Sequence, residues 1–222
     1  MKDSYTIERE NIIFRRAQIG DVFSEIAELI YFTDPYIYPF WFRDDVNYAC
    51  EVLAEYIAKP GFIFYFENLY VAYDRTTDHI VGIICAIDKT SDLTFDYSEL
   101  KSLDPHFRIT IEQYIEKIIK EAQTNDYLYI SNVCIDGDYR GKGLGTRLVG
   151  YYLGQMEKAG FEEFAVDCLL HNLRARNLYH NLGFIELAEY TGFDGTDHST
   201  VEAVSMRRRQ GAYLPTEFQA LE

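Results

Sequence analysis

A run of strand-forming residues in the second half of the chain ends in a glycine- and arginine-bearing turn that opens a helix. Residues 127–135 read Tyr-Leu-Tyr-Ile-Ser-Asn-Val-Cys-Ile, and residues 140–145 read Arg-Gly-Lys-Gly-Leu-Gly. Apolar residues recur at helical spacing in the stretch 146–156. The first N–H groups of a helix lack partners within it, and the helix dipole adds partial positive charge there. Glycines admit a phosphate close to that backbone, so the sequence predicts a pyrophosphate-binding turn.

The spacing of this turn excludes two common nucleotide-binding loops. A Walker loop needs four residues between its first glycine and a Gly-Lys pair, followed by Ser or Thr. Here three residues separate Gly137 from the pair at 141–142, and another glycine stands where the hydroxyl should be. A dinucleotide fingerprint needs Gly-x-Gly-x-x-Gly, but Thr146 or Leu148 occupies the third glycine position. What remains is Arg-x-x-Gly-x-Gly at residues 140–145, directly after a strand.

A second motif lies downstream, where residues 172–184 read Asn-Leu-Arg-Ala-Arg-Asn-Leu-Tyr-His-Asn-Leu-Gly-Phe. Together the two motifs resemble the signatures of the GCN5-related N-acetyltransferases (GNAT superfamily). These are an Arg-x-x-Gly-x-Gly loop for coenzyme A, then Asn-x-x-Ala-x-x-Leu/Phe-Tyr followed by Gly-Phe. They stand in the expected order, separated by one helix and one strand. The close match covers about residues 127–190, and a looser match runs from residue 9 to the end.

The resemblance implies the GNAT fold, an α/β (α+β) architecture whose mixed, mostly antiparallel sheet of about seven strands is flanked by helices. Strand patterns are found at 11–17, 69–73, 80–87, 127–135, 164–170, 184–190 and 201–206. In the family, the fourth and fifth strands run parallel and splay apart to receive the pantetheine arm of coenzyme A. We expect residues 1–222 to form a single acetyltransferase domain. Residues 89–126 are expected to be an insertion, serving as a lid or a dimer surface.

Helical spacing predicts a helix after Asp21, which can cap it, and another from Asp44 to Ala58. The stretch 33–42 between them is the most aromatic of the chain, and its two prolines are expected to rule out a regular helix or a central strand. It is either a loop packed over the core or a wall of the acceptor pocket, and the sequence leaves both readings open. Three arginines at 207–209 are expected to form a solvated strand end.

The resemblance also assigns roles to individual residues. Backbone groups of Val133 to Ile135 would pair with the pantetheine amides and the thioester oxygen, and the turn up to Thr146 would surround the pyrophosphate. Asn172 would either bond the pantetheine arm or only cap its helix. The full set expected to contact coenzyme A is Val133, Cys134, Ile135, Arg140, Gly141, Lys142, Gly143, Leu144, Gly145, Thr146, Asn172 and Tyr179.

Tyr179 is the expected catalytic residue. In the family a tyrosine at this place protonates the departing sulfur, and a phenol is an acid of suitable strength for a thiolate. The competing interpretation is a core aromatic residue on an amphipathic helix. No general base is identifiable. Asp167 lies on the fifth expected strand with its direction undetermined, and Asn132 stands where some relatives carry an acid. Gly137 replaces a proline that many relatives have.

Composition limits the partners. The 222 residues carry a formal net charge of −15 with a pI near 4.7, which argues against nucleic acid and anionic membranes. Four scattered cysteines predict reduced thiols, with neither a disulfide framework nor a metal site. The N-terminus lacks an apolar signal region and no segment reaches the length of a membrane span, so a cytoplasmic location is expected.

The leading hypothesis is therefore an acetyl-CoA-dependent N-acetyltransferase acting on a primary amine of a small molecule or a protein. The acidic charge slightly favours polyamine- or aminoglycoside-like acceptors. One alternative is a catalytically silent acyl-CoA-binding or regulatory module on the same fold. Another is an acyltransferase that uses a longer acyl chain.

Overall fold

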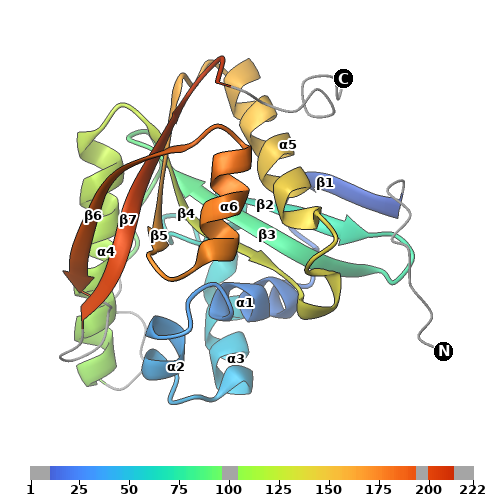
Figure 1. Cartoon of the computed structure of the whole chain (residues 1–222). Coiled ribbons are helices and arrows are strands. Elements are labelled where there is room, and N and C mark those ends of the chain that lie inside the picture. The colour runs from blue at the N-terminus through green and yellow to red at the C-terminus, as the bar shows by residue number, and fades with distance from the viewer. Residues whose placement is uncertain (1–10, 97–104, 194–199, 213–222) are drawn as a thin grey trace.

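The computed structural model describes residues 11–96, 105–193 and 200–212, and within them seven strands form one sheet (Figure 1). The sheet order is β1-β2-β3-β4-β5-β7-β6. Only β4 and β5 run parallel; the other neighbours are antiparallel, as expected from the sequence. The strands are β1 (Ile12–Arg16), β2 (Leu69–Asp74), β3 (His79–Ile87), β4 (Leu128–Ile135), β5 (Glu163–Leu169), β6 (Ile185–Phe193) and β7 (Thr200–Arg209).

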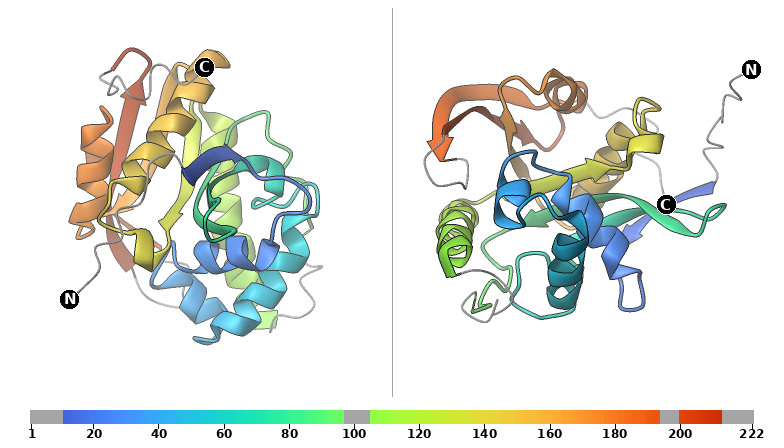
Figure 2. Two further views of the ribbon diagram at one scale, coloured as in Figure 1. Left: turned by 90° about the vertical axis from the view of Figure 1, so that its right-hand side faces the viewer. Right: turned by 90° about the horizontal axis from the view of Figure 1, so that it is seen from below.

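Helices cover both faces of this sheet (Figures 1 and 2). Helices α5 and α6 pack on one face, while α1, α3 and α4 pack on the other. Because both faces are covered, β3 is buried along almost its whole length. The helices are α1 (Phe23–Tyr31), α2 (Ile37–Trp41), α3 (Val46–Ile57), α4 (Pro105–Thr124), α5 (Leu144–Lys158) and α6 (Leu173–Asn181), with short 3₁₀ turns η2 (Phe66–Asn68) and η4 (Gly137–Tyr139).

Strand β4 opens away from β5 near its middle. The two strands pair only where residues 128–130 lie opposite residues 164–166. Directly after this ladder Ser131 forms a β-bulge on the other edge of β4, because its two neighbours pair with consecutive residues of β3. The Ser131 hydroxyl donates to the Cys85 carbonyl at 3.3 Å. A bulge bends its strand, so the sheet is parted at the point where the family resemblance predicts a splay.

Two local predictions in the first half of the chain are wrong. Asp21 does not cap α1, whose N-cap is Val22; its carboxylate instead forms an ion pair with Arg15 at 2.5 Å. The stretch 33–42 does contain a helix, the short α2. Pro39 is tolerated there because it is the third residue of α2, where a backbone N–H has no helical partner in any case.

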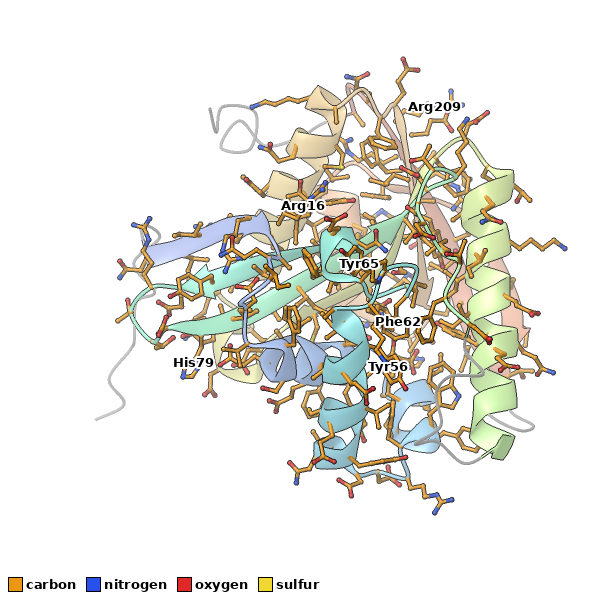
Figure 3. All side chains as sticks on the ribbon, turned by 180° about the vertical axis from the view of Figure 1, so that it is seen from behind. Arg16, Tyr56, Phe62, Tyr65, His79 and Arg209 are labelled. Carbon is orange, nitrogen blue, oxygen red and sulfur yellow. The ribbon has the colours of Figure 1, made fainter. Side chains whose placement is uncertain are left out.

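The stretch 33–42 is largely core. Tyr38, Trp41 and Phe42 are almost fully buried among the aromatic residues of α1 and α3. This aromatic layer continues below the sheet, where Tyr56 at the end of α3 meets Phe62 with ring centroids 5.8 Å apart (Figure 3). The layer fixes the position of α2 next to the splayed end of β4.

The arginines at the end of β7 are not all solvated, which corrects the expectation for residues 207–209. Side chains alternate along a strand, so Arg208 shares the face of Val204 and Met206 that packs under α5 and α6. Its buried guanidinium forms an ion pair with Glu157 at 2.5 Å and donates to the Leu182 carbonyl at 2.8 Å. Arg208 therefore connects β7 to both helices.

The expected insertion 89–126 contributes helix α4, which packs against β4. Its Ile115, Ile118 and Ala122 are buried in the core beneath the sheet. Residues 97–104 of this stretch lie outside the described residues. Among the described helices, none combines the length and apolarity that crossing a membrane requires.

Candidate active site

The glycine turn leads into α5 with a backbone that only glycine adopts readily. Gly141 and Gly143 have φ of +77° and +78°, and Gly143 is the N-cap of α5. The first helical hydrogen bond runs from the Arg147 N–H to the Gly143 carbonyl at 3.1 Å. The N–H groups of residues 144–146 precede this ladder and point out of the helix end. A Cβ at Gly141 or Gly143 would meet nothing within 4 Å, so the turn is open on its outer side.

The two charged side chains of the turn, Arg140 and Lys142, make different contacts. The Arg140 guanidinium folds back onto the end of β4, where Nε donates to the Ile135 carbonyl at 2.7 Å and a terminal nitrogen lies 3.6 Å from Cys134 Sγ. Lys142 is exposed, and its Nζ lies 5.8 Å from the centroid of the Tyr139 ring. An anion at this turn would therefore meet backbone N–H groups and Lys142 first, with Arg140 bracing the strand.

Gly145 has a separate, structural reason to be glycine. A Cβ there would lie 3.0 Å from Leu178 Cδ1, so its absence lets α5 and α6 approach closely. That contact ties the first motif to the second, since Leu178 precedes Tyr179 on α6. The two sequence motifs therefore pack directly against each other in the structure.

A cavity of about 440 Å³ lies where β4 and β5 part. Its walls come from both strands, from α4 and α6, from β6 and β7, and from the connection between α1 and α2. Of the residues expected to contact coenzyme A, Val133, Asn172 and Tyr179 line it. The side chains of Cys134 and Ile135 lie elsewhere, Cys134 in the core beneath the sheet. The contacts predicted for Cys134 and Ile135 use backbone atoms and do not depend on these side-chain positions, although the Ile135 carbonyl already accepts from Arg140 Nε.

Asn172 caps α6, because its Oδ1 accepts from the Ala175 N–H at 3.1 Å. Its side chain also lines the cavity, so the two interpretations of Asn172 are compatible. About two turns after the cap, α6 carries Tyr179 into the core. Tyr179 is 6% exposed, and its ring meets Phe184 with centroids 5.4 Å apart. Burial raises the pKa of the Tyr179 phenol, and the neighbouring Cys168 raises it further.

The other half of the cavity contains polar residues that the sequence motifs did not identify. The Tyr129 hydroxyl donates to Asp167 Oδ2 at 3.1 Å, and both residues line the cavity. Asp167 therefore points toward the opening, which settles the direction that the sequence left undetermined. Tyr114 and Lys117 reach the same space from α4. Tyr114 and Lys117 are three residues apart and so share one face of α4, which is the only indication of their proximity that the sequence contains.

Asn132 lies in the wall of the cavity, almost fully buried, and its side-chain amide is already engaged. Its side-chain amide donates to Thr33 Oγ1 at 2.8 Å and to the Tyr38 hydroxyl at 3.0 Å. The amide thereby holds the α1–α2 connection against β4. Thr33 and Ile37 line the cavity, so the aromatic stretch is both core and cavity wall. Within the described residues, no group of three or more His, Cys, Asp or Glu side chains is arranged to hold a metal ion.

The sequence model of the acetyltransferase (GNAT) family matches residues 30–184. The chain belongs to this family. N-alpha-acetyltransferase 30 of Xenopus laevis is 37% identical over 57 residues, which are 26% of this chain and 21% of that protein. The [ribosomal protein bS18]-alanine N-acetyltransferase of Escherichia coli (strain K12) is 28% identical over 81 residues, 36% of this chain and 55% of that protein. The chain thus matches between about a fifth and about half of these relatives' lengths.

Solved structures share the fold. An N-acetyltransferase from Staphylococcus aureus Mu50 superposes with a TM-score of 0.60 at 19% identity, covering 88% of this chain and 99% of that chain. The NatC complex bound to Gag peptide and CoA superposes with a TM-score of 0.53 at 19% identity, covering 90% and 98%. These likenesses confirm the GNAT fold expected from the two motifs.

The glycine turn yields a testable prediction about coenzyme A. Gly143→Ala should weaken binding about tenfold, because a left-handed conformation costs a residue with a Cβ about 1–2 kcal/mol and relaxation would misdirect the N–H groups at the start of α5. Isothermal titration of each variant with coenzyme A measures the effect. Gly137→Ala is the matched control, because Gly137 has no positive φ and a Cβ there meets nothing within 4 Å. Equal affinities of the two variants would contradict the role of this turn.

Proposed function

We propose that this protein transfers an acetyl group from acetyl-CoA to a primary amine of a small molecule or a protein. The observation that carries the proposal is the parting of β4 from β5, which leaves a cavity of mixed polar and apolar lining beside the strand that leads to the glycine turn. Bound acetyl-CoA would supply the activated acetyl group. The cavity also extends beyond Tyr179 toward Asp167 and Tyr114, which leaves room for an acceptor beside the donor.

The backbone around the glycine turn and the end of β4 supports the proposal for the donor half of the site. The N–H groups of residues 144–146, with Lys142, would hold the pyrophosphate at the start of α5. The edge of β4 after Ile130 has no β5 partner, so the backbone of residues 133–135 is available to the pantetheine amides and the thioester carbonyl. Asn172 would bond the same arm while capping α6. The residues present therefore fit the donor.

Tyr179 is proposed as the general acid. Because burial raises the pKa of its phenol, the hydroxyl stays protonated through neutral pH and can donate its proton to the departing sulfur. Cys168 lies on the same side of the cavity, and burial raises the pKa of its thiol to about 11, so it is not a ready nucleophile. Direct attack by the amine is consequently the simplest route.

The decisive experiment measures thiol release from acetyl-CoA in the presence of a panel of primary amines, together with the thermal shift on adding coenzyme A. We expect a thermal shift and amine-dependent thiol release. A thermal shift without turnover on any amine would favour a silent acyl-CoA-binding module. Faster release from longer acyl-CoA esters than from acetyl-CoA would favour a different acyl donor. The proposal treats the chain as a single acetyltransferase domain, and a cytoplasmic location stays a prediction.

A further inference from the structure

Two opposite charges face the cavity without being paired to each other. Lys117 extends from α4 and Asp167 from β5, and both line the space in which we place the acceptor. Neither side chain forms an ion pair within the described parts of the chain. The contact of Lys117 is with the ring of Tyr190 on β6, whose centroid lies 5.7 Å from Nζ. The contact of Asp167 is with the Tyr129 hydroxyl, which occupies Oδ2 and leaves Oδ1 without a hydrogen bond from the described residues.

The two charges lie at different depths. Lys117 is exposed, and its Nζ lies near the Tyr190 ring of β6. Helix α4 runs beside β6 and β7 (Figure 1). Asp167 is half-buried, and its partner Tyr129 is only 8% exposed. A ligand in the cavity therefore meets a carboxylate at its inner end and an ammonium group at its outer end.

The remaining lining combines aliphatic, aromatic and polar residues. The ring of Tyr114 packs against Trp41 with centroids 5.4 Å apart, and its hydroxyl has no hydrogen-bond partner within the described residues. The third charged residue of the lining, Asp34, already accepts from the Tyr36 and Ile37 N–H groups at 2.7 and 2.9 Å. Both contacts go to Asp34 Oδ1 and hold Asp34 at the start of α2, so we take Lys117 and Asp167 as the charges that a ligand engages.

Building on the proposed function, we propose that the acceptor is an amine that also carries an acidic group. Asp167 receives its ammonium group next to the acetyl donor, and Lys117 receives its carboxylate or other anion at the mouth of the cavity. Lys117 opposes a second ammonium group at that place, so simple diamines are disfavoured. This reverses the preference for polyamines that the net charge of the whole chain suggested, because a nearby charge acts more strongly than the screened distant ones.

The test compares acceptors of similar length that differ in their outer end: δ-aminovalerate, pentylamine and cadaverine. Two short peptides, one beginning with glutamate and one with lysine, are tested as well. Faster acetylation of the glutamate peptide than of δ-aminovalerate would identify an acidic protein N-terminus as the acceptor, and the opposite order would identify a small amino acid. We expect kcat/KM to be highest for an acidic acceptor. In Lys117→Glu, the ratio of acidic acceptor to diamine should fall about tenfold or more, because both the attraction and the repulsion change sign.

The control is Lys120→Glu, which makes the same charge change on an exposed residue of α4 that does not line the cavity. It should leave the ratio within about twofold of the wild-type value, as expected for a surface charge at a distance. A wild-type preference for cadaverine, or an equal effect of the two lysine variants, would overturn the inference. Calorimetric titration of the same amines into the protein saturated with coenzyme A gives the preference without turnover. If no amine is acetylated but the binding preference holds, it is the proposed function that fails.

Discussion

Tyr179→Phe is expected to lower kcat about a hundredfold or more while changing the KM for acetyl-CoA less than about threefold. The substitution removes only the hydroxyl, so the ring keeps its contact with Phe184 and the fold of α6 is retained. Without that proton the sulfur must leave as an unassisted thiolate. The measurement is steady-state thiol release at saturating amine, accompanied by the melting temperature of the variant.

Tyr152→Phe provides the matched control for this result. Tyr152 is as deeply buried as Tyr179, and burial raises the pKa of its phenol as well, but it packs against Tyr70 and does not line the cavity. A raised pKa alone therefore does not mark a catalytic tyrosine, whereas contact with the cavity does. Tyr152→Phe should keep nearly full activity. Unchanged turnover in Tyr179→Phe would remove Tyr179 from the role of general acid.

The second large effect concerns stability. Arg208→Met is expected to lower the free energy of unfolding by about 3 kcal/mol, because it leaves the Glu157 carboxylate and the Leu182 carbonyl without their buried donor. Because methionine keeps much of the apolar volume of the arginine side chain, the lost free energy of unfolding measures the contribution of the polar contacts. Chemical denaturation followed by circular dichroism measures it.

Arg209→Met tests the same change one residue further along β7. Arg209 stands at the periphery of the molecule (Figure 3), its side chain is 83% exposed, and its ion pair with Glu163 spans 2.9 Å. Exposed ion pairs contribute little, so this variant should stay within about 0.5 kcal/mol of the wild type. Equal stability losses in the two variants would show that Arg208 is not the connection between β7 and the two helices.

Much of the fold was predictable because its signals are local. Alternating and apolar runs gave the seven strands, and the glycine turn at residues 140–145 with the motif at residues 172–184 gave the order of the elements around the opening. Asn172 and Gly143 are the N-caps of α6 and α5. The backbone conformation at a helix cap favours particular residue types, so such positions can be recognised from the sequence. The sequence by itself therefore determined the class of fold and the expected donor.

Only the tertiary structure brought together the residues of the proposed acceptor half of the site. Lys117, Tyr129 and Asp167 come from three separate elements, and no spacing along the chain brings them to one cavity. Likewise, the direction of Arg208 depends on which face of β7 the helices α5 and α6 cover, and Pro39 is tolerated only because α2 begins two residues before it. Local motifs encode backbone turns and caps, whereas the charges facing a shared cavity are brought together by packing across the whole sheet.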